Sequence, residues 1–370
     1  MKNSTNASSG IRDDAAEGAG SSRAPAWNES RFLKACRLER VDVTPVWLMR
    51  QAGRYMPEYR RLRARTPFLK LCKTPDLVAE VTVSAAEKIG ADAAIIFADL
   101  LLLAEPLGFR IEYEKGEGPL VHPALRSRRD VERMPKADPR GALEYFYEGI
   151  RRTRAQLDPH TPLIGFAGAP FTLASYLIEG GSSRTFERTK RMMYTEPAAW
   201  RALMKRLVRA LALYVKGQIT AGVQAVQIFD TWAGCLAPAD YRAFVQPFSR
   251  ALIRSIEAPV IHFSTGSPAL TEALAEAGGA VIGLDHREDL DAAWARLGPG
   301  IGVQGNLDPA VLLGGRRVIR SNVERILRQA ARRPGHIFNL GHGVLPETPF
   351  ENVVALIEMV HEMSARQRAT

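Results

Sequence analysis

Two arginines spaced four residues apart form the segment best suited to bind anionic groups. Arg50 and Arg54 enclose Gly53, which permits a tight backbone between them. Each guanidinium carries a planar fork of donors that can hold one carboxylate through two parallel hydrogen bonds. The spacing therefore suits two separate carboxylates, whereas either arginine taken alone is equally well explained as a solvated surface residue.

A single acidic residue, Asp99, lies just behind the apolar run Ile95-Ile96-Phe97. This position favours a partly desolvated carboxylate that faces a site at the end of a strand. An Asp just after a strand also commonly caps the helix that follows. Both interpretations stay open at the level of the sequence.

Three further side chains could complete a polar site. His342 lies between Gly341 and Gly343, and glycines let the backbone approach a ligand whose carboxylate the histidine could bind. Tyr176 follows the helix start at Pro170, where a core tyrosine with one polar tip is the alternative. Thr231 could equally cap a helix.

Residues so far apart in the chain need a scaffold that brings strand ends together. Short apolar, β-branched runs recur between segments of helical period, which is typical of repeated βα units. Eight such runs predict strands at 45–49, 93–97, 163–166, 225–229, 260–263, 280–284, 302–304 and 336–340. Eight parallel strands close a barrel whose sites lie at the carboxyl ends of the strands, where all the candidate residues fall. We therefore predict the α/β class and a single (β/α)8 TIM barrel.

Helix signals and missing motifs support the closed barrel. A helix is predicted over 75–89, with Thr74 at the N-cap, Pro75 at the first helical position and Gly90 past the end, and another over 202–220. No GxGxxG or GxxxxGK[ST] motif is present, which argues against an open nucleotide-binding sheet.

The composition predicts one folded domain behind a tail. The chain has 370 residues, of which 46% are hydrophobic, enough for a sizeable core. Residues 1–28 are rich in Ser, Gly, Ala and Asn and nearly lack large apolar side chains, so we predict a disordered N-terminal tail. Residues 29–370 are predicted to form the catalytic barrel.

Charge and cysteine usage narrow the partners. Fifty Lys and Arg against 40 Asp and Glu give a formal charge of +10, which favours anionic partners. The basic residues occur in small groups interleaved with acids, without a nucleic-acid-binding motif, so we expect no nucleic-acid partner. Three cysteines without a CxxC or HxC pair argue against a thiolate metal site and favour a reducing compartment. Apolar runs are too short to span a membrane, and we expect a cytoplasmic protein with no membrane partner.

Four ordered blocks, from about residue 28 to about residue 363, resemble the uroporphyrinogen decarboxylase family. They read PVWLMRQAGRYMPEYR at 45–60, GFAGAPFTL at 165–173, QGNLDP at 304–309 and NLGHG at 339–343. The resemblance implies a cofactor-independent carboxy-lyase of haem biosynthesis, with neither metal nor organic cofactor. Its implied substrate is the tetrapyrrole uroporphyrinogen III, whose four acetate arms become methyls to give coproporphyrinogen III and four carbon dioxide molecules.

The resemblance also implies roles for the candidate residues and a homodimer. Asp99 would bind the pyrrole nitrogens and act in catalysis, and Arg50 would be a possible proton donor. The implied substrate-binding set is Arg50, Gln51, Ala52, Gly53, Arg54, Asp99, Tyr176, Thr231 and His342. Two positions depart from the family pattern: Thr231 replaces the serine of some relatives, and His286 replaces a common tryptophan.

Two alternative functions remain at this level. A zinc- and corrinoid-linked methyltransferase is a related barrel, but His262-Phe263-Ser264 has serine where an HxC pair would need a thiolate. His262 is instead predicted to be a core histidine. A non-enzymatic tetrapyrrole carrier on the same scaffold would bind the substrate without releasing carbon dioxide.

Overall fold

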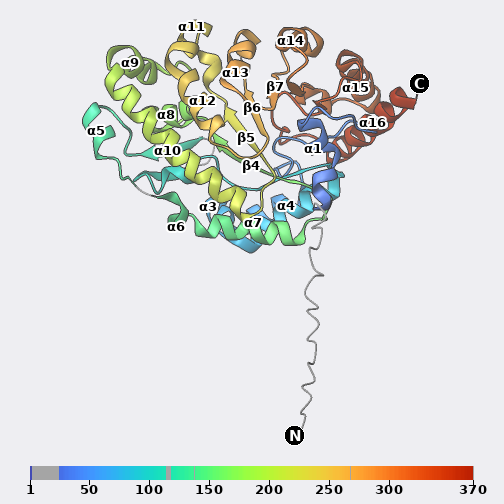
Figure 1. Cartoon of the computed structure of the whole chain (residues 1–370), viewed down its shortest axis with the longest axis horizontal. Helices are drawn as coiled ribbons and strands as arrows, with labels where there is room; N and C mark the ends of the chain where they lie inside the picture. The colour runs from blue at the N-terminus through green and yellow to red at the C-terminus, as the bar shows by residue number, and fades with distance from the viewer. Residues whose placement is uncertain (2–24, 114–117, 137, 267, 370) are drawn as a thin grey trace.

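A curled parallel sheet surrounded by helices forms the body of the protein (Figure 1). The computed structural model describes residues 1, 25–113, 118–136, 138–266 and 268–369. Seven strands are hydrogen-bonded in the order β1-β4-β5-β6-β7-β8-β9. Their bounds are β1 (Ala94–Ile95), β4 (Leu163–Gly168), β5 (Ala225–Asp230), β6 (Val260–Ser264), β7 (Val281–Gly283), β8 (Gly302–Gln304) and β9 (His336–Ile337). Most of the predicted tail lies outside the described residues.

The eighth position of the barrel is reduced to one residue. Val46 makes a parallel bridge to Phe338, and the amide of Asp92 donates to the Val46 carbonyl at 2.8 Å on the other side. Val46 thus joins the two ends of the seven-stranded sheet. The closed TIM barrel predicted from the sequence is confirmed, but the expected strand at 45–49 is wrong as a regular strand, because the chain turns away at Leu48, whose carbonyl accepts from the amide of Gln51.

The remaining strand predictions are confirmed with adjusted ends. The central strands β4, β5 and β6 extend one or two residues beyond the predicted runs, whereas β1, β7 and β9 are shorter. The strands β1 and β9 flank the single residue Val46, so each has a complete ladder on one side only. The missing hydrogen-bond partners on the other side explain why β1 and β9 are short.

Helices pack around the sheet in chain order. Their bounds are α1 (Arg31–Cys36), α2 (Pro57–Arg65), α3 (Phe68–Cys72), α4 (Pro75–Ile89), α5 (Arg128–Arg133), α6 (Pro139–Ala142), α7 (Glu144–Gln156), α8 (Pro170–Glu179), α9 (Glu187–Thr195), α10 (Pro197–Ala221), α11 (Pro238–Asp240), α12 (Gln246–Arg254), α13 (Thr271–Ala277), α14 (Leu290–Leu297), α15 (Arg316–Ala330) and α16 (Phe350–Ala369). None of these helices, within the residues that the structure describes, is long and apolar enough to cross a membrane.

Two helix predictions can be compared directly with the structure. The helix at 75–89 is confirmed at both ends, and Gly90 follows it in the left-handed conformation with φ of 71°. Thr74 occupies the N-cap position, but its hydroxyl donates to the carbonyl of Lys70 and does not cap the helix. The helix predicted at 202–220 begins earlier, at Pro197, because proline fits the first turn.

An antiparallel hairpin interrupts the barrel pattern. It consists of β2 (Arg110–Tyr113) and β3 (Pro119–His122), and sequence analysis did not identify it. The amide of Val121 donates to the carbonyl of Gly180 at 3.0 Å, and that of Leu125 donates to the carbonyl of Leu177 at 2.8 Å. These bonds fasten the hairpin to the C-terminal end of α8.

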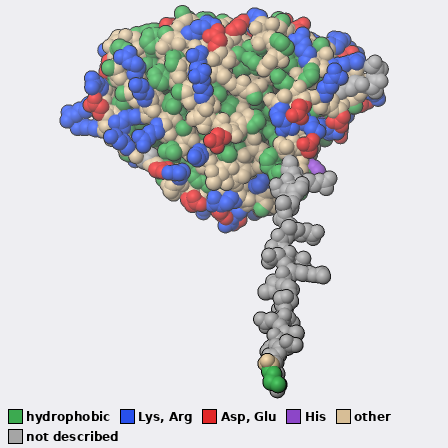
Figure 2. Space-filling model, viewed as in Figure 1, with side chains coloured by type: hydrophobic (Ala, Val, Ile, Leu, Met, Phe, Trp, Pro, Cys, Tyr) green, Lys and Arg blue, Asp and Glu red, His purple; other side chains and the backbone are tan. Residues whose placement is uncertain are grey.

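The surface agrees with the charge pattern of the sequence. On the face shown in Figure 2, basic side chains lie in small groups among acidic and uncharged ones. Large apolar side chains, including Trp47, Trp200 and Trp294, are instead fully buried in the core. Burial of these side chains is the main stabilising contribution to the barrel.

Candidate active site

The loop after Val46 exposes its arginines and buries its glutamine. Arg50 has a left-handed backbone with φ of 62°, and a Cβ on Gly53 would lie 2.9 Å from the Arg50 carbonyl oxygen. Gln51 is fully buried, and its backbone carbonyl accepts from the hydroxyl of Tyr55 at 2.6 Å. The tight turn therefore presents Arg50 and Arg54 at the surface while Gln51 anchors the loop.

The loop after β9 packs against this arginine loop. The amide of Val344 donates to the carbonyl of Met49 at 3.0 Å. A Cβ on Gly343 would lie 2.4 Å from Cδ of Arg50, so only glycine leaves room for the arginine stem. Residues nearly three hundred positions apart in the numbering, Arg50 and His342, are thereby brought together.

His342 is held as a neutral hydrogen-bond donor. Its Nδ1 accepts from the amide of Gly343 at 2.8 Å, which leaves the proton on Nε2. Burial lowers the pKa of His342, and the positive charge of Arg50 lowers it further. At pH 7 the imidazole is consequently neutral, with Nε2–H available to a ligand. The Arg50 side chain is exposed at the rim, yet desolvation by the protein around its guanidinium, followed by the charge of Arg54, lowers the pKa of Arg50.

Asp99 is a buried carboxylate with both oxygens engaged. The residue is 3% exposed. One oxygen accepts from the amide of Leu101 at 2.7 Å and the other accepts from the hydroxyl of Tyr113. Burial raises the pKa of Asp99, although the Tyr113 hydrogen bond acts in the opposite direction. The bond to Leu101 spans two residues and closes a turn, so Asp99 does not act as the N-cap of an α-helix.

Tyr176 connects Asp99 electrostatically with the arginine loop. It projects from α8, and its ring packs edge-on against Trp232 with centroids 5.4 Å apart. Burial raises the pKa of Tyr176 to about 12, with the negative charge of Asp99 adding to this shift and the positive charge of Arg50 opposing it. The charges of Asp99 and of Arg50 therefore both act on the Tyr176 hydroxyl.

Thr231 is half-buried on a clamped loop after β5. Its carbonyl accepts from the hydroxyl of Thr265 at 2.8 Å. The hydroxyl of Thr172 donates to the carboxylate of Asp230 at 3.2 Å and accepts from the amide of Trp232 at 3.3 Å. Side chains from α8 and from the end of β6 thus fix the backbone on both sides of Thr231.

The loop after β7 borders the same region. Asp285 is 3% exposed and accepts from the amides of Gly266 and Arg287 at 2.5 and 2.9 Å. His286 lies with Nδ1 3.5 Å from the Asp285 carboxylate. A Cβ on Gly341 would lie 2.1 Å from the amide nitrogen of His286, so the two loops pack directly. His262 is fully buried, as predicted, and its Nδ1 lies 3.2 Å from the carbonyl of Leu274.

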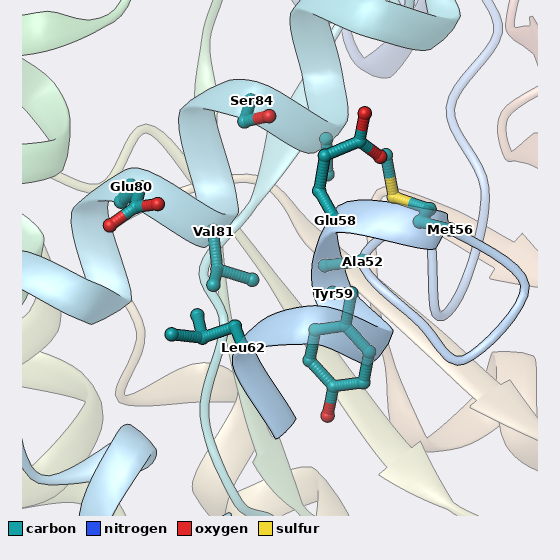
Figure 3. Close-up of a pocket in the computed structure, with 9 residues that line it drawn as sticks. Ala52, Met56, Glu58, Tyr59, Leu62, Glu80, Val81 and Ser84 are labelled. Carbon is teal, nitrogen blue, oxygen red and sulfur yellow. The ribbon is translucent and has the colours of Figure 1, made fainter. Parts of the chain in front are cut away.

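A small pocket between α2 and α4 involves one candidate residue without containing the polar cluster. Its volume is about 30 Å3, room for about one water molecule. Figure 3 shows side chains of α2 and α4 around it, and the lining residues are Ala52, Met56, Glu58, Tyr59, Leu62, Glu80, Val81, Ser84 and Ala85. This pocket is too small for a tetrapyrrole.

Sequence reasoning missed Tyr113 as a member of this site. The available signal was the alternation of Phe109 and Ile111 with Arg110 and Glu112, which is typical of a strand with one buried face. Which residue of such a strand reaches Asp99 depends on how the hairpin packs on the barrel.

The assembled groups suit a polyanion with N–H donors at its centre. Arg50, Arg54 and His342 supply cationic or N–H groups, and Asp99 supplies a desolvated acceptor. In the parts of the chain that the structure describes, no cluster of three or more His, Cys, Asp or Glu side chains could hold a metal.

Sequence comparisons with known proteins agree on one family. The sequence model of the family described as uroporphyrinogen decarboxylase (URO-D) matches residues 28–363. A uroporphyrinogen decarboxylase of Sorangium cellulosum (strain So ce56) is 51% identical over 336 residues, covering 90% of this chain and 96% of the relative. One from Roseiflexus sp. (strain RS-1) is 52% identical over 344 residues, with coverages of 91% and 99%.

Among solved structures, a methyltransferase from Methanosarcina mazei has the same fold. It superposes with a TM-score of 0.76 and 22% sequence identity, covering 90% of this chain and 98% of that one. At this identity the similarity concerns the barrel architecture alone.

Proposed function

The chain belongs to the uroporphyrinogen decarboxylase family, and from this membership we propose that it decarboxylates uroporphyrinogen III. The proposed reaction converts the four acetate arms to methyls and yields coproporphyrinogen III and four carbon dioxide molecules. The observation that carries the proposal at this site is the buried Asp99 carboxylate, whose charge acts on Tyr176 together with the opposing charge of Arg50.

The residue roles follow from the two kinds of group on the substrate. Carboxylates surround a tetrapyrrole, and pyrrole N–H groups point toward its centre. Arg50 and Arg54 would bind carboxylates through guanidinium forks, and His342 would add its Nε2–H. Asp99 would accept from the central N–H groups. The backbone of Gln51, Ala52 and Gly53 and the hydroxyls of Tyr176 and Thr231 complete the proposed binding set.

The chemistry needs a sink for the electrons left when carbon dioxide departs. Protonation of a pyrrole carbon creates a cation that accepts those electrons, so we propose catalysis without metal or organic cofactor. A carboxylate held in a poorly hydrated position stabilises this cation strongly, which is the role of Asp99. Arg50 is proposed as the proton donor because its side chain lies against the glycine next to His342 at the same rim of the barrel.

The proposal also covers the domain organisation, the oligomeric state and the cellular location of the protein. We propose that residues 29–370 form the catalytic barrel and that two copies form a homodimer, as the family resemblance implies. The predicted end of the tail at residue 28 is wrong, because Ala26–Glu29 forms a 3-10 turn whose Trp27 packs against the core. We therefore propose that only residues 1–22 are dispensable for catalysis. A cytoplasmic location is supported by the three cysteines, all free thiols. Light scattering on the purified protein would test the dimer.

Product analysis tests the reaction directly. Purified protein is incubated anaerobically with uroporphyrinogen III, and the porphyrins are separated by carboxylate number after oxidation. We expect coproporphyrin to accumulate, with turnover unchanged after dialysis against a strong chelator. Binding without product would favour a carrier. Turnover lost on chelation and restored by zinc would favour the methyltransferase alternative.

A further inference from the structure

The hairpin places a second tyrosine directly on Asp99. Tyr113 is the last residue of β2, and its hydroxyl donates to one oxygen of the Asp99 carboxylate. Although 39% of Tyr113 is exposed, this hydroxyl reaches a carboxylate that is only 3% exposed. The tyrosine thus extends from the surface of the hairpin to a buried carboxylate on the segment that follows β1.

Aromatic packing fixes the position of the Tyr113 ring. The ring of Phe68 on α3 meets it edge-on, with centroids 5.0 Å apart and planes at 75°. The ring of Phe68 also packs edge-on against the ring of Phe97, with centroids 6.0 Å apart. Phe97 lies two residues before Asp99 in the sequence. This aromatic chain links the segment just after β1 to the hairpin, so the hydroxyl and its acceptor are held by the same packing.

The hydrogen bonds leave Asp99 free to accept more donors. Its two oxygens offer about four lone-pair positions, of which Leu101 N–H and Tyr113 O–H use one on each oxygen. The remaining positions can receive pyrrole N–H groups while Tyr113 keeps its bond. Tyr113 therefore does not compete with the proposed substrate for all of the carboxylate.

We propose that Tyr113 is a positioning residue of the decarboxylation site, which aims the Asp99 carboxylate at the substrate ring through its hydroxyl hydrogen bond. This inference rests on the proposed function. Tyr113 acts through Asp99 and takes no part in bond breaking.

The pH dependence of the reaction distinguishes this role from simple packing. Catalysis by ionised Asp99 is lost as pH falls through the pKa of this carboxyl group. Burial raises this pKa, and the Tyr113 hydrogen bond lowers it because it favours the ionised form. Removing the hydroxyl should therefore move the acid limb of kcat/KM to higher pH.

Other groups around Asp99 set the background for this shift. From the α3–α4 junction, Cys72 and Lys73 face it, and Glu105 lies on the segment that follows Asp99. Tyr145 on α7, Tyr176 on α8 and Tyr214 on α10 also interact electrostatically with its charge. None of these groups is altered when Tyr113 becomes phenylalanine, so the change in the limb reports the lost hydroxyl.

The experiment compares pH profiles of kcat/KM for uroporphyrinogen III in the wild type, Tyr113→Phe and Tyr145→Phe. Tyr145 is the matched control, because its buried hydroxyl has no hydrogen-bond partner within the described residues. We expect Tyr113→Phe to move the acid limb upward by about one pH unit, the scale of one hydrogen bond to a charged group. On the alkaline side, where Asp99 is ionised in both proteins, kcat/KM should stay at least about threefold below the wild type, because the hydroxyl no longer aims the carboxylate. Tyr145→Phe should follow the wild-type profile.

A second variant keeps the test decisive if Tyr113→Phe does not fold. In this variant 3-fluorotyrosine replaces Tyr113. The fluorinated ring has nearly the same shape, and its hydroxyl is a stronger hydrogen-bond donor. The acid limb of kcat/KM for this variant should therefore move to lower pH. A wild-type limb in the folded Tyr113 variants, or an equal shift in Tyr145→Phe, would overturn the role of Tyr113. Absence of coproporphyrinogen from the wild-type reaction would instead contradict the proposed function.

Discussion

Burial of Asp99 has opposite consequences for stability and for the proposed chemistry. Burial raises the pKa of this carboxyl group above its ordinary value of 3.8, so the folded protein binds the proton more tightly than the unfolded chain does. Stability from this group therefore falls as pH rises from about that ordinary value through the raised folded-state value. The same desolvation strengthens the attraction between the carboxylate and a pyrrolium cation.

Asp99→Asn separates these two effects. An asparagine oxygen can still accept from Leu101, whereas the negative charge is lost, so we expect kcat to fall by about 100-fold, or roughly 3 kcal/mol of transition-state stabilisation. The melting temperature at pH 7 should stay within about 2 °C of the wild type or rise, because the charge penalty disappears. Near-normal turnover with a lowered melting temperature would return Asp99 to a structural role.

The glycines on either side of His342 should respond differently to alanine. In Gly343→Ala the new methyl meets the Arg50 side chain, which can move, so we expect a rise in KM of about tenfold with little change in melting temperature. In Gly341→Ala the methyl meets the backbone of His286, which cannot move as easily, and we expect a loss of several kcal/mol or failure to fold. Equal melting temperatures for the two variants would contradict this assignment.

At the level of elements, the loop after β5 depends on its neighbours. Thr172 on α8 connects the Asp230 carboxylate to the amide of Trp232, and Ser264 at the end of β6 donates to the carbonyl of Asp230 at 2.9 Å. The contacts come from three consecutive βα units. The position of Thr231 is therefore set by the packing of the units, and not by its own turn alone.

Thr172→Val tests whether this clamp positions the site. Valine keeps the branched shape but removes the hydroxyl, leaving Asp230 and the Trp232 amide with one partner fewer, which should cost about 1–3 kcal/mol of stability. We also expect KM for uroporphyrinogen to rise several-fold. Thr153→Val on α7 is the control, because its buried hydroxyl donates to the carbonyl of Gly149 within the helix. An equal KM in both variants would limit the clamp to stability.

On the scale of the whole molecule, Asp92 holds the barrel closed. Its carboxylate accepts from the amide of Val46 at 2.7 Å and lies 2.7 Å from Nε2 of His361 on α16, with Arg31 of α1 at 3.8 Å. These contacts join the first and last helices to the one-residue closure. Side-chain exposure of Asp92 is 12%, so the contacts are poorly screened by water.

Asp92→Ala should destabilise the barrel as a whole. The Val46 amide would lose its partner and His361 its carboxylate, so we expect the free energy of unfolding to fall by about 2–4 kcal/mol in a denaturant titration. Asp42→Ala is the control, since Asp42 pairs with Arg31 on the surface and should contribute at most about 1 kcal/mol. A similar small loss in both variants would show that closure does not depend on Asp92.

Deleting residues 1–22 should leave catalysis unchanged. That segment lacks the large apolar residues needed to dock on the barrel. Extending the deletion through residue 36 removes α1, whose Phe32 and Leu33 are buried, and should lower the melting temperature by several degrees. A large fall in kcat for the folded shorter deletion would contradict the proposed tail.

Most of the fold could be read from local patterns. Apolar runs such as 225–229 are strands because β-branched side chains suit a buried parallel ladder, and α4 is delimited by Pro75 and Gly90 through backbone conformations that those residues favour. Once eight strands are counted, the candidate residues at their ends fall on one rim. The sequence alone therefore determined the barrel and the residues to consider at its mouth.

Tertiary structure decided which of those residues meet and in what state. Val46 closes the barrel as one bridge, Gly343 leaves space for Arg50, and Tyr113 reaches Asp99 across the hairpin. Each contact joins segments whose separation is fixed only when helices and sheet pack, and hydrophobic periodicity carries no information about such distances. The pKa shifts of Asp99 and His342 arise in the same way, because burial is a property of the packed molecule and not of the residue.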